Sequence, residues 1–86
     1  MDGSTLEVAR PRVRLRRAVW DTKVKQHGLA TDTACAELLQ TSQSTIHRIK
    51  EDKVEPSGKF IASALWRLPG TTFEELFEVV VTRAGD

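Results

Sequence analysis

Residues that start or stop helices divide this chain into short segments, and their spacing constrains the fold more than any other feature. Glycine accepts the left-handed backbone that ends a helix and proline cannot continue one, so Gly28 and the pair Pro69-Gly70 mark helix ends. Four hydroxyl residues that can accept hydrogen bonds from the first free N–H groups of a helix are Thr31, Ser42, Ser57 and Thr72. The sequence therefore predicts a compact all-α bundle of short helices.

About five helices are expected, over residues 12–26, 32–39, 43–51, 57–68 and 73–81. Valine favours strands, so the three consecutive valines at 79–81 allow the C-terminal end to form a strand or an extended tail instead. We expect residues 1–11 to be a flexible basic arm, residues 12–82 a single domain, and residues 83–86 a disordered tail.

A chain of 86 residues holds one hydrophobic core, which excludes a two-domain enzyme with a cleft between its domains. The sequence offers no nucleophile with a base, no paired carboxylates in a cleft and no glycine-rich phosphate loop. The single Cys35 and the two histidines, His27 and His47, lack the spacing of a zinc site. We therefore expect no catalysis and no metal or other cofactor.

No apolar run approaches the roughly 20 residues that a membrane span requires, and the N-terminus lacks the basic-then-apolar order of a signal peptide. The expected location is the cytoplasm, in association with the nucleoid, and no membrane partner is expected.

Charge is unevenly distributed although the net charge is only +1. Residues 1–27 carry seven Lys and Arg against three Asp and Glu, whereas residues 54–86 carry three against five. A basic front can be steered toward phosphates, but an ordinary solvated surface also shows such charge runs.

Two short helices separated by a few residues, the second of them polar, suggest a helix-turn-helix. With about 100° of rotation per residue, Ile46 and Ile49 share one side of segment 43–51, and Ser44, His47 and Arg48 lie on the other. Amide, hydroxyl and guanidinium groups read base edges in a major groove, which favours DNA reading by this segment. An ordinary amphipathic surface helix gives the same pattern, so this alternative stays open.

Residues 31–53 resemble the helix-turn-helix core of the phage lambda-repressor and Cro-like (XRE) regulators, and a looser likeness extends over residues 13–80. A threonine begins the first helix of that core, a small alanine lies where the two helices cross, and a Ser-x-Ser-Thr-aliphatic-x-Arg-Ile run forms the recognition helix. The residues that fit these positions are Ala36, Leu39, Thr41, Ser42, Ser44, Thr45, Ile46, Arg48 and Ile49. The resemblance implies a small phage- or plasmid-type regulator.

Four positions depart from the family pattern. Gln40 replaces the usual turn glycine, which implies a costlier left-handed residue or a reshaped turn. Asp32 replaces a glutamine that normally contacts phosphate, and an acid there is unfavourable beside DNA. Cys35 replaces a leucine, and Ala30 lengthens the preceding loop by one residue. None of these departures falls on the recognition face.

The resemblance also implies roles for particular side chains. Base contacts are expected from Gln43, Ser44, His47 and Arg48. Phosphate contacts are expected from Thr31, Thr45, Lys50, Lys53, Ser57 and Lys59. In the arm and directly after it, Arg10, Arg12 and Arg14 resemble basic tracts that enter narrow minor grooves, and the alternative is a tail that only neutralises phosphates.

A homodimer is expected because one module makes too few DNA contacts for useful specificity, and it can form on DNA alone. On a helix over 12–26, Leu15 and Val19 lie opposite Val13, Trp20 and Val24, so they form a second apolar stripe. This stripe and the apolar last segment supply the candidate interface residues, which are Leu15, Val19, Phe77 and Val80.

The sequence thus predicts a sequence-specific regulator of the Cro or repressor type that binds a double-stranded DNA operator. One alternative is an antitoxin of the same fold that binds a toxin and its own operator. The other is a protein-interaction module that uses the fold without DNA.

Overall fold

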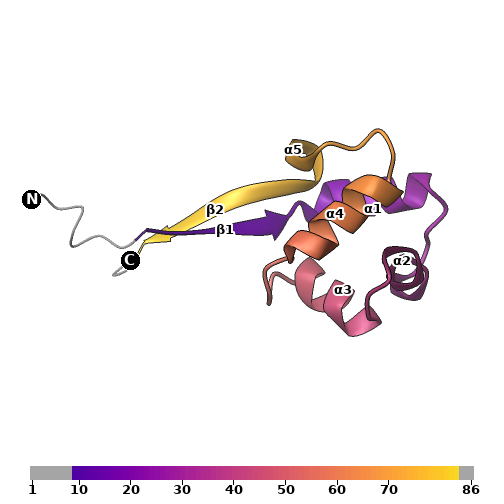
Figure 1. The fold of residues 1–86 in the computed structure, drawn as a ribbon, viewed down its shortest axis with the longest axis horizontal. Coiled ribbons are helices and arrows are strands. Elements are labelled where there is room, and N and C mark those ends of the chain that lie inside the picture. The colour runs from indigo at the N-terminus through magenta and orange to yellow at the C-terminus, as the bar shows by residue number, and fades with distance from the viewer. Residues whose placement is uncertain (1–8, 84–86) are drawn as a thin grey trace, which may run out of the picture.

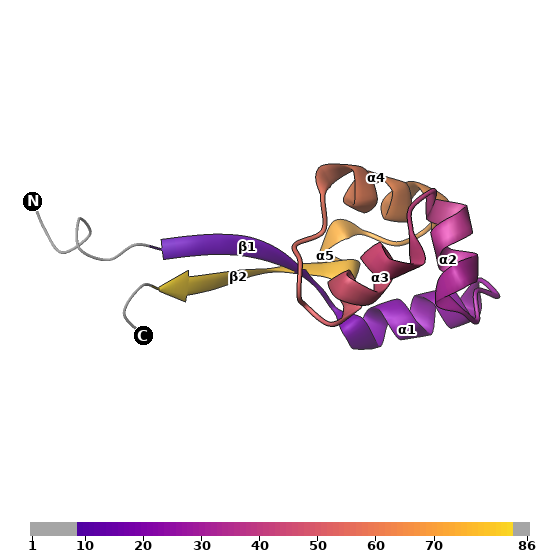
Figure 2. The same cartoon turned by 90° about the horizontal axis from the view of Figure 1, so that it is seen from below.

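A computed structural model describes residues 9–83 of the chain (Figure 1). In chain order the elements are β1 (Ala9–Leu15), α1 (Arg17–Gln26), α2 (Asp32–Leu39), α3 (Gln43–Lys50), α4 (Gly58–Arg67), α5 (Phe73–Leu76) and β2 (Phe77–Arg83). The helices form one body, and the two strands form a ribbon that projects from it (Figures 1 and 2). The extents of 52 × 25 × 21 Å reflect this projection.

The fold is α+β, so the expected all-α class is wrong. Strand β1 pairs with β2 in antiparallel register, from Leu15 opposite Phe77 to Ala9 opposite Arg83. The first helix begins at Arg17 rather than at residue 12, and the last helix ends at Leu76 rather than at residue 81. The valines at 79–81 are part of β2.

The physical reason for this correction lies in residues 10–15, where arginines alternate with apolar or proline residues. Alternation with a period of two is the pattern of a strand with two different faces. A helix over residues 12–26 combines residues of β1 with those of α1. This is why two opposite apolar stripes were predicted. Of the expected arm, residues 1–8 lie outside the described residues, and 9–11 belong to β1. Of the expected tail, residues 84–86 lie outside them as well, and Arg83 ends β2.

The hydroxyl caps predicted from the sequence are confirmed. Each accepts a hydrogen bond from the backbone N–H three residues on, at 3.0–3.2 Å, and these caps are Thr31, Ser42, Ser57 and Thr72. Thr72 forms a full capping box, because its own N–H donates to Glu75 Oε1 at 2.9 Å. The pKa of Glu75 is lowered mainly by this hydrogen bond.

One hydrophobic core joins the helices to the base of the ribbon. Phe77 is 1% exposed and stacks on Phe73, with 5.3 Å between ring centroids, and it meets Phe60 edge-on at 6.4 Å. Leu15, its cross-strand partner, is also buried. Further out, Val79 and Val81 are 61% and 51% exposed, so on β2 the hydrophobic core holds the ribbon at its base. No helix within residues 9–83 has the length and apolar character needed to cross a bilayer.

Candidate nucleic-acid interface

Helices α2 and α3 are joined by a tight turn at Gln40. This residue has φ 57° and ψ 47°, the left-handed conformation that its replacement of glycine implied. The backbone N–H of Thr41 donates to the Ala36 carbonyl at 3.0 Å, which satisfies a free carbonyl at the end of α2. The two helices therefore form a helix-turn-helix unit in which the turn bears the strain of a non-glycine residue.

Helix α3 has one buried and one exposed side. Ile46 and Ile49 are 0% and 2% exposed, which fixes the rotation of the helix about its axis. The four side chains expected to contact bases are all exposed and, together with Asp32, line an open depression on the surface: Gln43, Ser44, His47 and Arg48. Polar side chains of several hydrogen-bonding types are thus presented together from one short helix.

The amide of Gln43 is held in place by α2. Its Nε2 donates to Thr33 Oγ1 at 2.9 Å. This bond uses one of the two amide hydrogens and leaves Oε1 available as an acceptor. Thr33 was not among the residues expected at the site. Sequence patterns do not reveal which single residue of α2 faces Gln43.

Lys50, expected to contact phosphate, is already paired. Its Nζ lies 2.8 Å from Asp32 Oδ1, and its side chain is 16% exposed. This pair links the C-terminal end of α3 to the N-terminal end of α2 and neutralises the acid that appeared unfavourable beside DNA. Behind it, Cys35 is 2% exposed, and burial raises the pKa of its thiol. Lys50 therefore serves the packing of the two helices.

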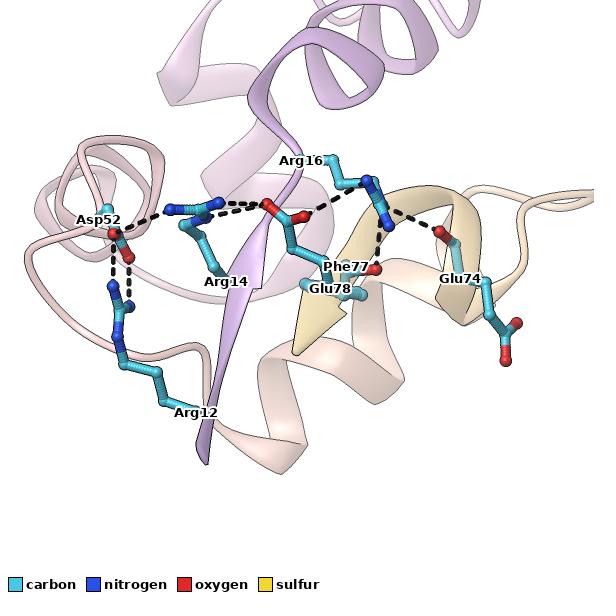
Figure 3. Close-up of polar contacts among 7 residues, drawn as sticks. All are labelled: Arg12, Arg14, Arg16, Asp52, Glu74, Phe77 and Glu78. Atoms are coloured by element: carbon cyan, nitrogen blue, oxygen red, sulfur yellow. Dashed lines mark hydrogen bonds and ion pairs between the residues drawn. The ribbon is translucent and has the colours of Figure 1, made fainter. Parts of the chain in front are cut away.

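Two of the arm arginines are bound within the protein (Figure 3). Arg12 donates to both carboxylate oxygens of Asp52, at 2.6 and 2.8 Å, and this hydrogen bonding holds the pKa of Asp52 below its usual value and raises that of Arg12. Arg14 binds Glu78 at 2.7 Å, and Arg16 approaches the same carboxylate at 3.4 Å. Arg12 and Arg14 therefore belong to a paired strand and bind acids of this chain, and their contact with DNA stays a prediction.

Of the remaining phosphate candidates, some act as caps and some are unpaired cations. The hydroxyls of Thr31 and Ser57 accept capping hydrogen bonds from backbone N–H groups. Thr45 Oγ1 accepts a side-chain hydrogen bond from Ser42 Oγ at 2.8 Å. Among these phosphate candidates, three exposed cations have no acidic partner within residues 9–83, and these are Arg10, Lys53 and Lys59.

The expected dimer stripe is not exposed. Leu15 and Phe77 are 5% and 1% exposed and belong to the core, and Val19 is partly buried against it. Val80 lies on β2 and is half-buried. The stripe of Leu15 and Val19 was an outcome of assigning residues 12–15 to a helix, so these two residues do not mark an interface. Of the four candidates, Val80 lies outside the core and remains a candidate.

Sequence reasoning missed the acids that organise the ribbon, namely Asp52, Glu55 and Glu78. Glu55 Oε2 accepts a hydrogen bond from the backbone N–H of Val13 at 2.8 Å. The alternating arginines of β1 were the available signal, because a row of cations on one face of a strand requires acids nearby.

No family model, curated protein or solved structure matches this chain, so a function must be inferred from its own residues.

Proposed function

We propose that this protein is a sequence-specific regulator that binds double-stranded DNA, most simply of the Cro or repressor type, with α3 in the major groove. The observation that carries the proposal is the exposed set of Gln43, Ser44, His47 and Arg48 above two fully buried isoleucines. A helix fits the width of the major groove, and these side-chain types match the donors and acceptors of base edges.

The chemistry of each group suggests what it reads. The Arg48 guanidinium can donate two hydrogen bonds to O6 and N7 of guanine. Since Thr33 holds the amide nitrogen of Gln43, the free Oε1 suits an amino donor, on adenine or cytosine. The hydroxyl of Ser44 can either donate or accept.

Fewer cations are free for phosphates than the composition suggests. Arg12, Arg14 and Lys50 are in ion pairs, which leaves Arg10, Lys53 and Lys59 as unpaired candidates within residues 9–83. We therefore expect a shallow salt dependence, with a log–log slope of about −3 per chain.

The test is selection of bound duplexes from a random pool, followed by affinity measurements on the selected site and on random DNA. Arg48→Ala should weaken binding to the selected site by about 5- to 150-fold and relax the preference at one position. Lys53→Ala should weaken binding to both duplexes alike and reduce the salt slope by about one.

Arg67→Ala is the matched control. Arg67 ends α4, stacks on Trp66 at 4.2 Å, and does not line the α3 depression, so removing its guanidinium should leave the base preference unchanged. No enrichment of any sequence, or equal effects of Arg48→Ala and Arg67→Ala, would overturn the proposal.

One observation favours a second candidate function, protein binding without DNA. Trp66 is 72% exposed, and exposed tryptophan with arginine is typical of protein interfaces. Failure to bind random DNA even at low salt, together with a partner whose affinity falls in Trp66→Ala, would favour this alternative.

A further inference from the structure

The two edges of the ribbon differ, and only one of them is blocked. On β1, the N–H of Val13 donates to Glu55, so it points away from β2. Because inward and outward groups alternate along an antiparallel pair, residues 9, 11 and 13 all direct their backbone groups to this outer edge. Residue 11 is proline, which has no N–H to offer. Acid, proline and flanking arginines thus close the β1 edge against strand addition.

At the base of β2 the Phe77 carbonyl accepts a hydrogen bond from Arg16 at 3.2 Å, but residues 79–82 of the outer edge have none of these protections among the described residues. Val79 and Val81 lie opposite Val13 and Pro11, so by the same alternation their N–H and C=O groups point outward. Both side chains are more than half exposed. In both views no helix lies beside the outer half of β2 (Figures 1 and 2). An isolated two-stranded ribbon is marginally stable in water, so this edge is suited to pairing.

We propose that the β2 edge pairs with the same edge of a second copy, antiparallel about Val80, to form a four-stranded sheet. In this register Val79 faces the partner's Val81, and the two Val80 residues face each other. Each pair of Val79 and Val81 then exchanges two main-chain hydrogen bonds. The four exposed valines form one continuous row of cross-strand contacts.

Charge favours a second copy as the occupant. Across the new seam Glu78 faces the partner's Thr82, so no like charges meet. Arg10, unpaired among the described residues, lies opposite Thr82 of its own chain and on the same face as the partner's Glu78. Arg10 and the partner's Glu78 are separated by two strand spacings of roughly 5 Å each. Long side chains such as these can bridge that distance. Pairing through β1 about Arg12 would instead oppose Arg12 to itself and Arg10 to Arg14.

The first test is sedimentation equilibrium of the full chain without DNA over a range of concentrations. The wild-type chain should dimerise reversibly. Val81→Pro removes an N–H that points away from β1, as the natural Pro11 does opposite it, so the ribbon is retained while the dimer loses two donors. The dissociation constant of the dimer should increase by about 4- to 150-fold, since each of the two lost hydrogen bonds costs a factor of roughly 2 to 12. Val81→Thr keeps the N–H and should dimerise nearly as well.

The second test measures the register and does not depend on Val81→Pro being folded. Val80→Cys should form an intermolecular disulfide readily, because a facing non-hydrogen-bonded pair has Cα atoms about 4.5 Å apart. Thr82→Cys should not, because it faces the partner's Glu78. The native Cys35 is 2% exposed and does not compete.

A chain that stays monomeric at its highest soluble concentration, a dimer that Val81→Pro does not weaken, or equal cross-linking by both cysteines would overturn the inference. None of these measurements uses DNA. Arg48→Ala should dimerise like the wild-type chain, so the failure of DNA reading and the failure of strand pairing are distinguishable.

Discussion

The helical body and the ribbon are stabilised in different ways. In the helical body each of α2 to α5 begins at a hydroxyl cap, and apolar side chains such as Trp20, Ile46 and Leu68 are almost completely buried. Among the ribbon side chains whose burial the structure describes, only Leu15 and Phe77 are buried, while ion pairs at the surface hold the middle. Apolar burial involves no charges and is not weakened by screening, whereas surface ion pairs are screened by salt and titrate with pH. The two regions should therefore respond differently to mutation and to solution conditions.

The largest effect is expected at the base of the ribbon. Phe77→Ala should lower the free energy of unfolding by about 3 to 5 kcal/mol, because it removes a buried ring that contacts Phe60 and Phe73. Val79→Ala should change it by less than about 0.5 kcal/mol when the protein is dilute enough to be monomeric. Urea denaturation measures both. Similar losses would mean that the whole ribbon, and not its base alone, stabilises the monomer.

The capping box tests whether local hydrogen bonds matter in the helical body. Thr72→Ala should destabilise the protein by about 1 kcal/mol, since the N–H of Glu75 loses its acceptor. Thermal unfolding gives the size of the effect. Thr82→Ala is the matched control at an exposed strand position, and a larger loss there would reverse the comparison.

The turn between α2 and α3 should gain stability from glycine. Gln40→Gly relieves a left-handed residue at φ 57° and should stabilise the chain by roughly 0.5 to 1 kcal/mol. Glu37→Gly, within α2, should destabilise it by about the same amount. If both variants lose stability in chemical denaturation, the side chain of Gln40 makes a favourable contribution that outweighs the strain.

The smallest effect is expected at the link between ribbon and helical body. The pKa of Asp52 is lowered in the folded protein, chiefly by its hydrogen bonds with Arg12. Its stabilisation is therefore present above the ordinary aspartate pKa and is lost as pH falls through the lowered value. Asp52→Asn, which still tolerates the positive φ of this position, should show a flatter acid limb in stability against pH. Identical acid limbs in the two proteins would show that the pair contributes nothing.

The parts of the fold that depend on neighbouring residues could be predicted from the sequence. Caps such as Ser42 act within three residues, and the isoleucines of α3 follow helical spacing, so the rotation of α3 about its axis was foreseeable. The pairing of the two strands could not be predicted this way. Leu15 and Phe77 are far apart in the sequence, and only the tertiary fold brings them together. The free cations were overestimated for the same reason, since Lys50 meets Asp32 only through the packing of α2 on α3.

The blocked edge of β1 has a consequence for how far association can proceed. A ribbon with two open edges would recruit further copies on both sides and grow into fibrils. In the proposed dimer, Glu55 and Pro11 close the two β1 edges, and pairing of the two β2 edges uses up the remaining sites for strand addition on the described ribbon. Growth would then stop at a closed, two-fold assembly, although three valines in a row lie on an outer strand.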